Sequence, residues 1–173
     1  MRKTVEEITH ILVRLQDVKN SQGDGFHWEM TVPKGFELPQ SLHQNFVPIH
    51  HKDVSSEKIS LFQIWEKKTR TVRTVSDAQS FFEGQRSRHP LNMSAVDFVL
   101  ANTSELIESS NLTEEINLIL FIASVFPSTT SSVMVVVGIH KVARDHWQVL
   151  PRGYDIQKSF DPSTTAIAIY NMV

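Results

Sequence analysis

Residues 131–150 read SSVMVVVGIHKVARDHWQVL, and this stretch predicts a β-hairpin. Its first arm, Val133 to Val142, is rich in valine and isoleucine, which are enriched in strands. Arg144 and Asp145 follow as turn residues, and His146 to Leu150 forms the second arm. The chain therefore contains a sheet, and the segments around this hairpin decide how the sheet is covered.

Two helices are expected upstream of the hairpin. Ser76 followed by Gln79 is a capping-box pattern, and it predicts a short helix that carries Phe81 and Phe82 and is limited by Gly84 and Pro90. Ser94 with Asp97 repeats the start signal for a second helix. Its apolar positions fall on one helical face: Val96, Val99, Leu100 and Ile107.

A third helix is expected directly before the hairpin. Thr113 is its predicted cap, Glu114 and Glu115 fall in its first turn, and Pro127 lies beyond its end. The residues from Ile116 to Phe126 are apolar nearly all the way round a helix. We therefore expect this to be the most buried helix of the domain.

The remaining segments complete an α+β fold. Alternating residues predict strands over 5–18, where a helix is the alternative, and over 26–32, joined as a hairpin. Segments 59–65 and 69–75 also read as extended, and 166–170 is a last apolar run. The prediction is a single domain, 1–173, with an antiparallel sheet built from hairpins, three helices packed on one side, and a long irregular loop at 33–57.

Composition excludes several function classes. The chain of 173 residues has 17 Lys+Arg, 19 Asp+Glu and no cysteine, so thiol catalysis, cysteine-ligated zinc and iron–sulfur clusters are ruled out. We see neither a secretory signal nor an apolar run long enough to span a bilayer. The expected location is cytoplasmic.

Basic residues cluster next to the first predicted helix. Residues 67–73 carry four positive charges in a chain whose formal net charge is −2, so the charge distribution is asymmetric. Such a cluster attracts phosphates on RNA, a nucleoprotein or an anionic membrane surface. The alternative is that these charges only protect a strand edge from pairing. The candidate anionic partner-binding residues are Lys67, Lys68, Arg70, Arg73, Arg86 and Arg88.

The loop at 33–57 carries apolar residues that an irregular segment does not obviously bury. Either they fold back onto the sheet, or they dock on another copy or another protein. We take them as candidates for self-association: Phe36, Leu38, Leu42, Phe46, Val47 and Ile49.

Enzymatic signals are weak. The chain has no GxSxG, P-loop or GxGxxG pattern. The same loop holds His43, His50, His51 and Asp53, but their spacing matches no metal-ligand pattern. We therefore expect no catalytic residues, no cofactor and no metal. Sequence-specific DNA binding is not expected either, since no recognised nucleic-acid motif is present.

Two stretches carry a family resemblance. Ile59 to Ala78, which runs through KKTRTVRTVSDA, resembles the start of the globular core of rhabdovirus matrix proteins, and 131–150 resembles their near-C-terminal hairpin. The length is similar to that of the small matrix proteins of plant-infecting members, and the PPxY motif of many animal members is absent. The resemblance implies a non-enzymatic protein that self-associates, condenses a nucleocapsid and bridges it to a lipid envelope. It also implies a location in the virion interior.

Three hypotheses therefore remain open. The first is a self-associating structural protein, in its specific form a viral matrix protein, which binds itself, nucleoprotein–RNA and an anionic membrane surface. The second is a stoichiometric binding module of the chaperone or immunity type. The third is a metal-dependent hydrolase that uses the histidines of loop 33–57.

Overall fold

The computed structural model describes most of the chain beyond residue 57. The described residues are 35–37, 58–64, 72–85, 87–91, 93–113, 115–128 and 132–171. The predicted hairpin at 5–18 and 26–32, nearly all of loop 33–57, and residues 65–71 lie outside this part. The single domain over 1–173 and the loop boundaries therefore stay predictions.

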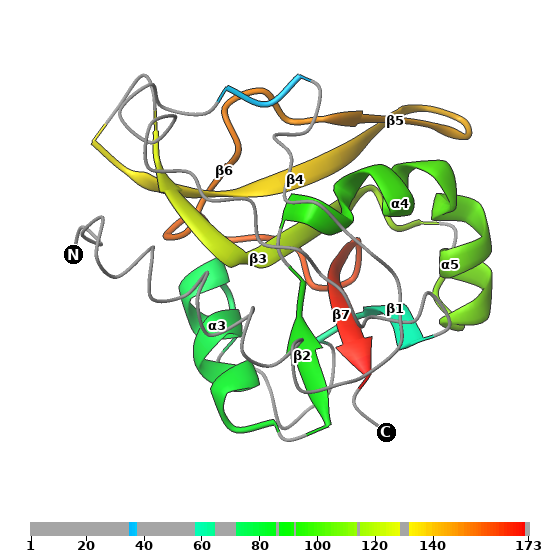
Figure 1. Ribbon diagram of the computed structural model, residues 1–173, viewed down its shortest axis with the longest axis horizontal. Coiled ribbons are helices and arrows are strands. Elements are labelled where there is room, and N and C mark those ends of the chain that lie inside the picture. The colour runs from blue at the N-terminus through cyan, green and yellow to red at the C-terminus, as the bar shows by residue number, and fades with distance from the viewer. Residues whose placement is uncertain are drawn as a thin grey trace.

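The described strands form one seven-stranded mixed sheet (Figure 1). Its main order is β1-β7-β3-β4-β5, with β2 pairing to β7 and β6 pairing to β4. Strands β3 and β7 run parallel, and the other pairs are antiparallel. The strands are β1 (Ile59–Phe62), β2 (Arg88–Pro90), β3 (Leu118–Pro127), β4 (Met134–Ala143), β5 (His146–Val149), β6 (Tyr154–Asp155) and β7 (Thr165–Asn171).

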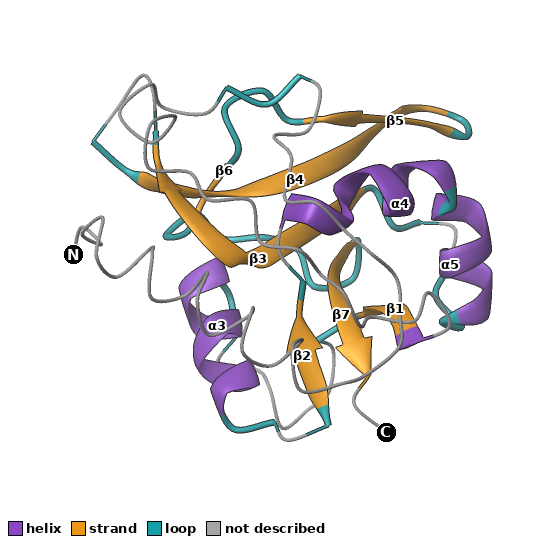
Figure 2. Ribbon diagram, viewed as in Figure 1, coloured by secondary structure: helices purple, strands orange, loops and turns teal. Residues whose placement is uncertain are grey.

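Helices pack against both faces of this sheet. Figure 2 shows the helices in purple and the strands in orange. Helix α3 (Val75–Glu83) packs Val75, Ala78 and Phe82 into one buried cluster. A 3-10 turn (Met93–Ala95), α4 (Val96–Ala101) and α5 (Thr103–Ser109) pack into another cluster. Successive residues of β7 alternate between the two clusters, so the clusters lie on opposite faces.

The α+β prediction is confirmed, but two of its details are wrong. The sheet is not purely antiparallel, because β3 pairs in parallel with β7 through Leu118 to Leu120. The helices are not on one side either, since α3 lies across the sheet from α4 and α5. In Figure 1 the two groups stand on either side of β2 and β7.

The predicted third helix is wrong, because the run from Leu118 to Pro127 is strand β3. Ile119 and Phe121 enter the α4–α5 cluster, whereas Leu120 and Ile122 enter the α3 cluster. A strand buried on both faces needs apolar side chains in both directions. The feature that resembled a fully buried helix is therefore the pattern of a central strand, with a register shift between Phe121 and Val125.

The other helix predictions are partly right. The helix carrying Phe81 and Phe82 exists and ends at Gly84, but its cap is Thr74 and not Ser76. The second predicted helix is divided at Asn102, whose side-chain amide donates to the Phe98 carbonyl at 2.9 Å. Such a side-chain bond competes with the helical backbone pattern and ends α4 there.

Most strand predictions within the described part are confirmed. The hairpin forms as β4 and β5, and Asp145 at its turn has a φ of 57°. Strand β1 lies within 59–65, and β7 includes 166–170. The extended prediction for 69–75 is wrong at its described end. Thr74 makes only an isolated bridge to Ser159, and α3 begins at Val75.

Candidate functional site

Three phenylalanines gather on the α3 face of the sheet, at the end of β1. Phe62 lies nearly parallel to Phe81, with ring centroids 6.1 Å apart and planes at 19°. Phe82 meets both rings edge-on, at 5.7 Å from Phe62 and 5.2 Å from Phe81. Phe82 is buried in the core, whereas Phe62 and Phe81 are partly exposed. The cluster therefore presents part of an aromatic pair to solvent.

Arg88 adds a positive charge to this cluster. It is the first residue of β2, half-buried, and its guanidinium carbon lies 4.6 Å from the centroid of the Phe62 ring. This is the geometry of a cation–π contact. Within the described residues, no carboxylate pairs with the guanidinium. We call Arg88, Phe62 and Phe81 the Arg88 corner.

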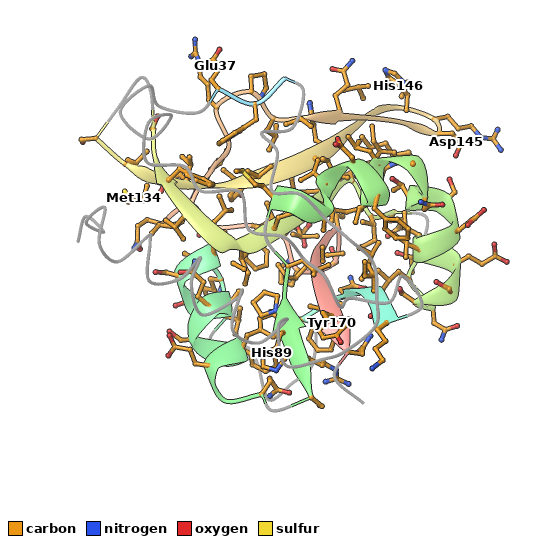
Figure 3. The ribbon with its side chains drawn as sticks, viewed as in Figure 1. Glu37, His89, Met134, Asp145, His146 and Tyr170 are labelled. Carbon is orange, nitrogen blue, oxygen red and sulfur yellow. The ribbon has the colours of Figure 1, made fainter. Side chains whose placement is uncertain are left out.

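Hydrogen bonds hold the strands beside this corner together. The Asn171 side-chain amide donates to the Ser60 hydroxyl at 2.8 Å and to the Lys58 carbonyl at 3.0 Å. Asn171 is also the register partner of Arg88. The next pair along, His89 and Tyr170, lies at the same end of the sheet, as Figure 3 shows. The base of the corner is therefore built from three strands, β1, β7 and β2.

Arg73 is the second predicted cation that the structure places. Its side chain is exposed, and its backbone is fixed because the carbonyl accepts from Phe160 N–H at 2.9 Å. Its backbone N–H donates to the Asp77 carboxylate at 3.0 Å. This bond, helped by bonds from Thr74 and by the Arg73 charge, lowers the pKa of Asp77 against the opposing effect of burial. Asp77 therefore carries its negative charge at neutral pH.

The structure does not bring Arg73 and Arg88 together. Arg73 precedes the first residue of α3, and Arg88 follows the last one. Arg88 lies on Phe62, which stacks on Phe81 in the last turn of α3, whereas Arg73 lies just before the first turn. The other four predicted cations, Lys67, Lys68, Arg70 and Arg86, lie outside the described residues.

We call residues 67–73 the basic segment. Val72 and Arg73 are the described residues within it, and Ile64 is the last described residue that comes before it. Ile64 is 4% exposed and Val72 is 8% exposed, and both belong to the α3 cluster. Ile64 and Val72 therefore lie on the face of the sheet that carries the Arg88 corner. The placement of Lys67, Lys68 and Arg70 stays a prediction.

Phe36 lies in the core of its own chain. It is 7% exposed, and its ring centroid is 5.8 Å from that of Phe126. The next residue, Glu37, donates its backbone N–H to the Pro151 carbonyl at 2.8 Å. Phe36 therefore folds back onto its own sheet, which is the first of the two alternatives for this loop. Its buried ring is not available to another copy. Leu38, Leu42, Phe46, Val47 and Ile49 lie outside the described residues, and their role stays a prediction.

Strand β5 ends the main strand order and pairs only with β4 among the described strands, which leaves it one open edge within this part of the chain. Leu150 N–H donates to the Gly138 carbonyl, so Gln148 and Leu150 direct their backbone groups toward β4. The backbone groups of Trp147 and Val149 must then point outward. They have no hydrogen-bond partner within the described part of the chain.

The opposite edge of the sheet, at β1, is covered at one backbone group. Leu61 N–H of β1 donates to the Ser110 hydroxyl at 3.0 Å, just beyond α5. Exposed strand edges are templates for pairing, and proteins commonly cover them. The two ends of the main strand order therefore differ among the described residues, because the Leu61 N–H of β1 has a side-chain partner and the outward backbone groups of Trp147 and Val149 have none.

The described residues show no grouping of three or more histidine, cysteine or acidic side chains that would hold a metal ion. They also contain no helix with the length and apolar character needed to cross a membrane. The metal hypothesis concerns residues that lie outside this part of the chain, namely His43, His50, His51 and Asp53. The structure therefore does not test it.

The sequence alone did not point to the Arg88 corner. It placed Phe81 and Phe82 on a helix and Arg88 in a basic set, but Phe62 is 26 positions before Arg88 and no local pattern joins the two. The contact depends on β1 and β2 flanking β7, which only the tertiary fold shows.

Comparisons of the chain with protein-family models, with curated proteins and with solved structures found no match.

Proposed function

We propose that this chain is a non-enzymatic structural protein that binds copies of itself and an anionic partner. The observation that carries the proposal is the stacked guanidinium of Arg88. An arginine held against an aromatic ring, with no carboxylate on it among the described residues, keeps its N–H donors for an outside acceptor. Phosphates and carboxylates are the acceptors that fit a guanidinium best.

The basic segment supports the same partner class. Ile64, just before the segment, and Val72, within it, are both buried on the face that carries Arg88. The segment has four cations in seven residues, and in this proposal they add to the attraction of an anionic partner. Long-range attraction of this kind depends on ionic strength, so binding should weaken as salt rises.

The open edge of β5 supports self-association. Two copies that align their β5 strands would pair the outward backbone groups of Trp147 and Val149, as in β-strand addition. The contact uses a part of the chain separate from the Arg88 corner, so both could operate in one assembly. The five predicted loop residues from Leu38 to Ile49 would add apolar contacts to it.

The specific form of the proposal is a matrix-type protein that bridges a nucleocapsid and a lipid envelope. It rests on the resemblance of 59–78 and 131–150 to rhabdovirus matrix proteins. A strand leading into a capped helix, and a hairpin, are common in unrelated α+β domains. What supports the bridging role is therefore the combination of an anion-facing surface and an open edge.

The partner is tested by pelleting with anionic liposomes or with ribonucleoprotein. Replacing Lys67, Lys68, Arg70 and Arg73 with glutamate should abolish pelleting, because the variant repels the same surface. Arg152 is exposed on the connection after β5, so Arg152→Glu is the single-charge control and should retain binding. Unchanged pelleting of the fourfold variant would refute the basic segment's role.

Self-association is tested by sedimentation velocity at rising concentration and falling salt. The double variant His146→Lys, Gln148→Lys places two charges on exposed positions of β5 and should keep the protein monomeric. Ser104→Lys, Ser109→Lys adds the same charge to exposed positions of α5 and should still assemble. A wild-type protein that stays monomeric throughout overturns this part, and a saturable complex with one other protein favours the stoichiometric module instead.

A further inference from the structure

We propose that the Arg88 corner binds a nucleotide of a single-stranded nucleic acid, with the phosphate on Arg88 and the base on Phe81. This inference rests on the proposed function, because it names the anionic partner of the same face. It adds a requirement that charge alone does not supply, which is that the partner must present a planar ring next to its phosphate.

The phosphate half of the site follows from Arg88. The guanidinium is planar and carries five N–H donors, and its contact with Phe62 at 4.6 Å restricts its orientation. Restricting the side chain in advance reduces the conformational entropy that is lost on binding. Its half-buried position also reduces solvent screening of the charge. A phosphate oxygen pair is therefore a good match for the exposed edge of this group.

The base half follows from the phenylalanine pair. Phe81 and Phe62 are offset and nearly parallel, and Phe82 packs edge-on against both, which holds the two rings in place. Partly exposed, rigid aromatic rings are the platforms on which unpaired bases stack. Arg88 and Phe81 both contact the ring of Phe62, so this ring connects the phosphate site with the base site.

This combination favours a single strand over the other anions considered. In a duplex the base faces are already stacked on each other and cannot reach Phe81. A lipid headgroup supplies a phosphate but no planar ring. An acidic peptide supplies carboxylates for Arg88 but leaves the exposed part of Phe81 without a matching group.

The test compares three labelled probes of equal length by fluorescence anisotropy at low salt. They are an adenine-rich single-stranded RNA, its duplex, and a ribose-phosphate strand without bases. The single strand should bind about 10-fold more tightly than the baseless strand, as expected for one stacked base. Equal affinity for those two strands would overturn the proposal.

Variants then separate the two halves of the site. Phe81→Leu keeps apolar volume at a partly exposed position, and it should lower single-strand affinity about 10-fold while leaving the baseless strand unchanged. Arg88→Lys keeps the charge but not the planar fork, and it should weaken both strands. Arg152→Gln removes one exposed charge elsewhere and should change affinity much less. Thermal unfolding checks that each variant is folded.

The outcomes distinguish this inference from the proposed function. If anionic liposomes and the baseless strand bind but the bases add nothing, the nucleotide site is wrong and the proposed function stands. If Phe81→Leu binds every probe as the wild type does, the base site is wrong. If no anionic probe binds at all, both are wrong.

Discussion

Thr74 and Asp77 close a reciprocal pair of hydrogen bonds around the first turn of α3. Asp77 N–H donates to the Thr74 hydroxyl at 3.2 Å, and Thr74 N–H donates to the Asp77 carboxylate at 3.1 Å. The same carboxylate accepts from Arg73 N–H. The capping box therefore fixes both the start of α3 and the backbone at the end of the basic segment.

Thr74→Ala should destabilise the protein by about 1 kcal/mol, because it removes the acceptor for a helix-terminal N–H. Ser80 is exposed within α3 and serves as a control. Ser80→Ala should change the free energy of unfolding by less than about 0.5 kcal/mol. Urea denaturation measures both values, and equal effects would contradict the capping role.

The contribution of Asp77 should depend on pH with a definite sign. Its pKa in the folded protein lies below the ordinary value of 3.8, chiefly through the bond from Arg73 N–H. Stability linked to its charge is therefore present above the ordinary pKa and is lost as the pH falls through the folded pKa. Asp77→Asn should be less stable than the wild type by a constant amount above about pH 5, and the difference should shrink below about pH 4. Urea denaturation across this range tests it, and a difference that grows on acidification would contradict it.

Gly153 should tolerate alanine much less well than Gly35. Both have positive φ, 71° and 94°, so alanine should cost about 1 kcal/mol at either site. At Gly153 a Cβ would also lie 2.7 Å from the Val136 carbonyl oxygen, whereas at Gly35 its nearest neighbour would be 3.9 Å away. Crowding of this kind should add about 2 kcal/mol at Gly153. Chemical denaturation of the two variants measures the two losses of unfolding free energy. Similar losses would show that the backbone between β5 and β6 can shift to make room for the Cβ.

Local patterns predicted β4 and β5 well and β3 badly, and the reason is burial. The β4–β5 hairpin projects past the core at its turn, so its polar residues and turn signal are visible in the sequence. Strand β3 is buried on both faces and has no polar face to reveal a period of two. Thr113, Glu114 and Glu115 also match the residue pattern of a helix start, although Thr113 caps no helix in the described structure.

Val137 and Val142, two of the valines of β4, should respond differently to truncation. Val137 is fully buried, and Val142 is 43% exposed near the turn. Val137→Ala should cost about 2 kcal/mol, because two methyl groups leave a packed core. Val142→Ala should stay within about 0.5 kcal/mol of the wild type. Urea denaturation midpoints test this, provided that the unfolding free energy of both variants depends equally on urea concentration. A large effect at Val142 would place that residue against another part of the chain or another copy.

The candidate site was less predictable than the fold, because it joins residues from separate segments. The sequence identified cations near the first helix, and it could not show that Arg88 stacks on Phe62 while Arg73 lies at the other end of α3. The sequence also left open whether the apolar residues of loop 33–57 fold back onto the sheet or dock on another copy or another protein. Only the packing of Phe36 on Phe126 shows that this residue turns inward.

The β1 edge of the sheet should lose its side-chain cover when the Ser110 hydroxyl is removed. Leu61 is 4% exposed, and its N–H has the Ser110 hydroxyl as partner. Ser110→Ala leaves a buried donor without an acceptor and should cost about 1–2 kcal/mol. The neighbouring Ser109 hydroxyl is exposed and bonds only within its own helix, so Ser109→Ala should be nearly neutral.

Hydrogen exchange gives a second readout that a general loss of stability would not reproduce. In Ser110→Ala the Leu61 amide should exchange faster than the amides of β3, because its only described acceptor is gone. The variant should also assemble at lower concentration than the wild type, since the Leu61 N–H of β1 would then be an additional unpaired donor for strand pairing. An unchanged assembly threshold together with unchanged Leu61 exchange would mean that packing against α5, and not the hydroxyl, covers this edge.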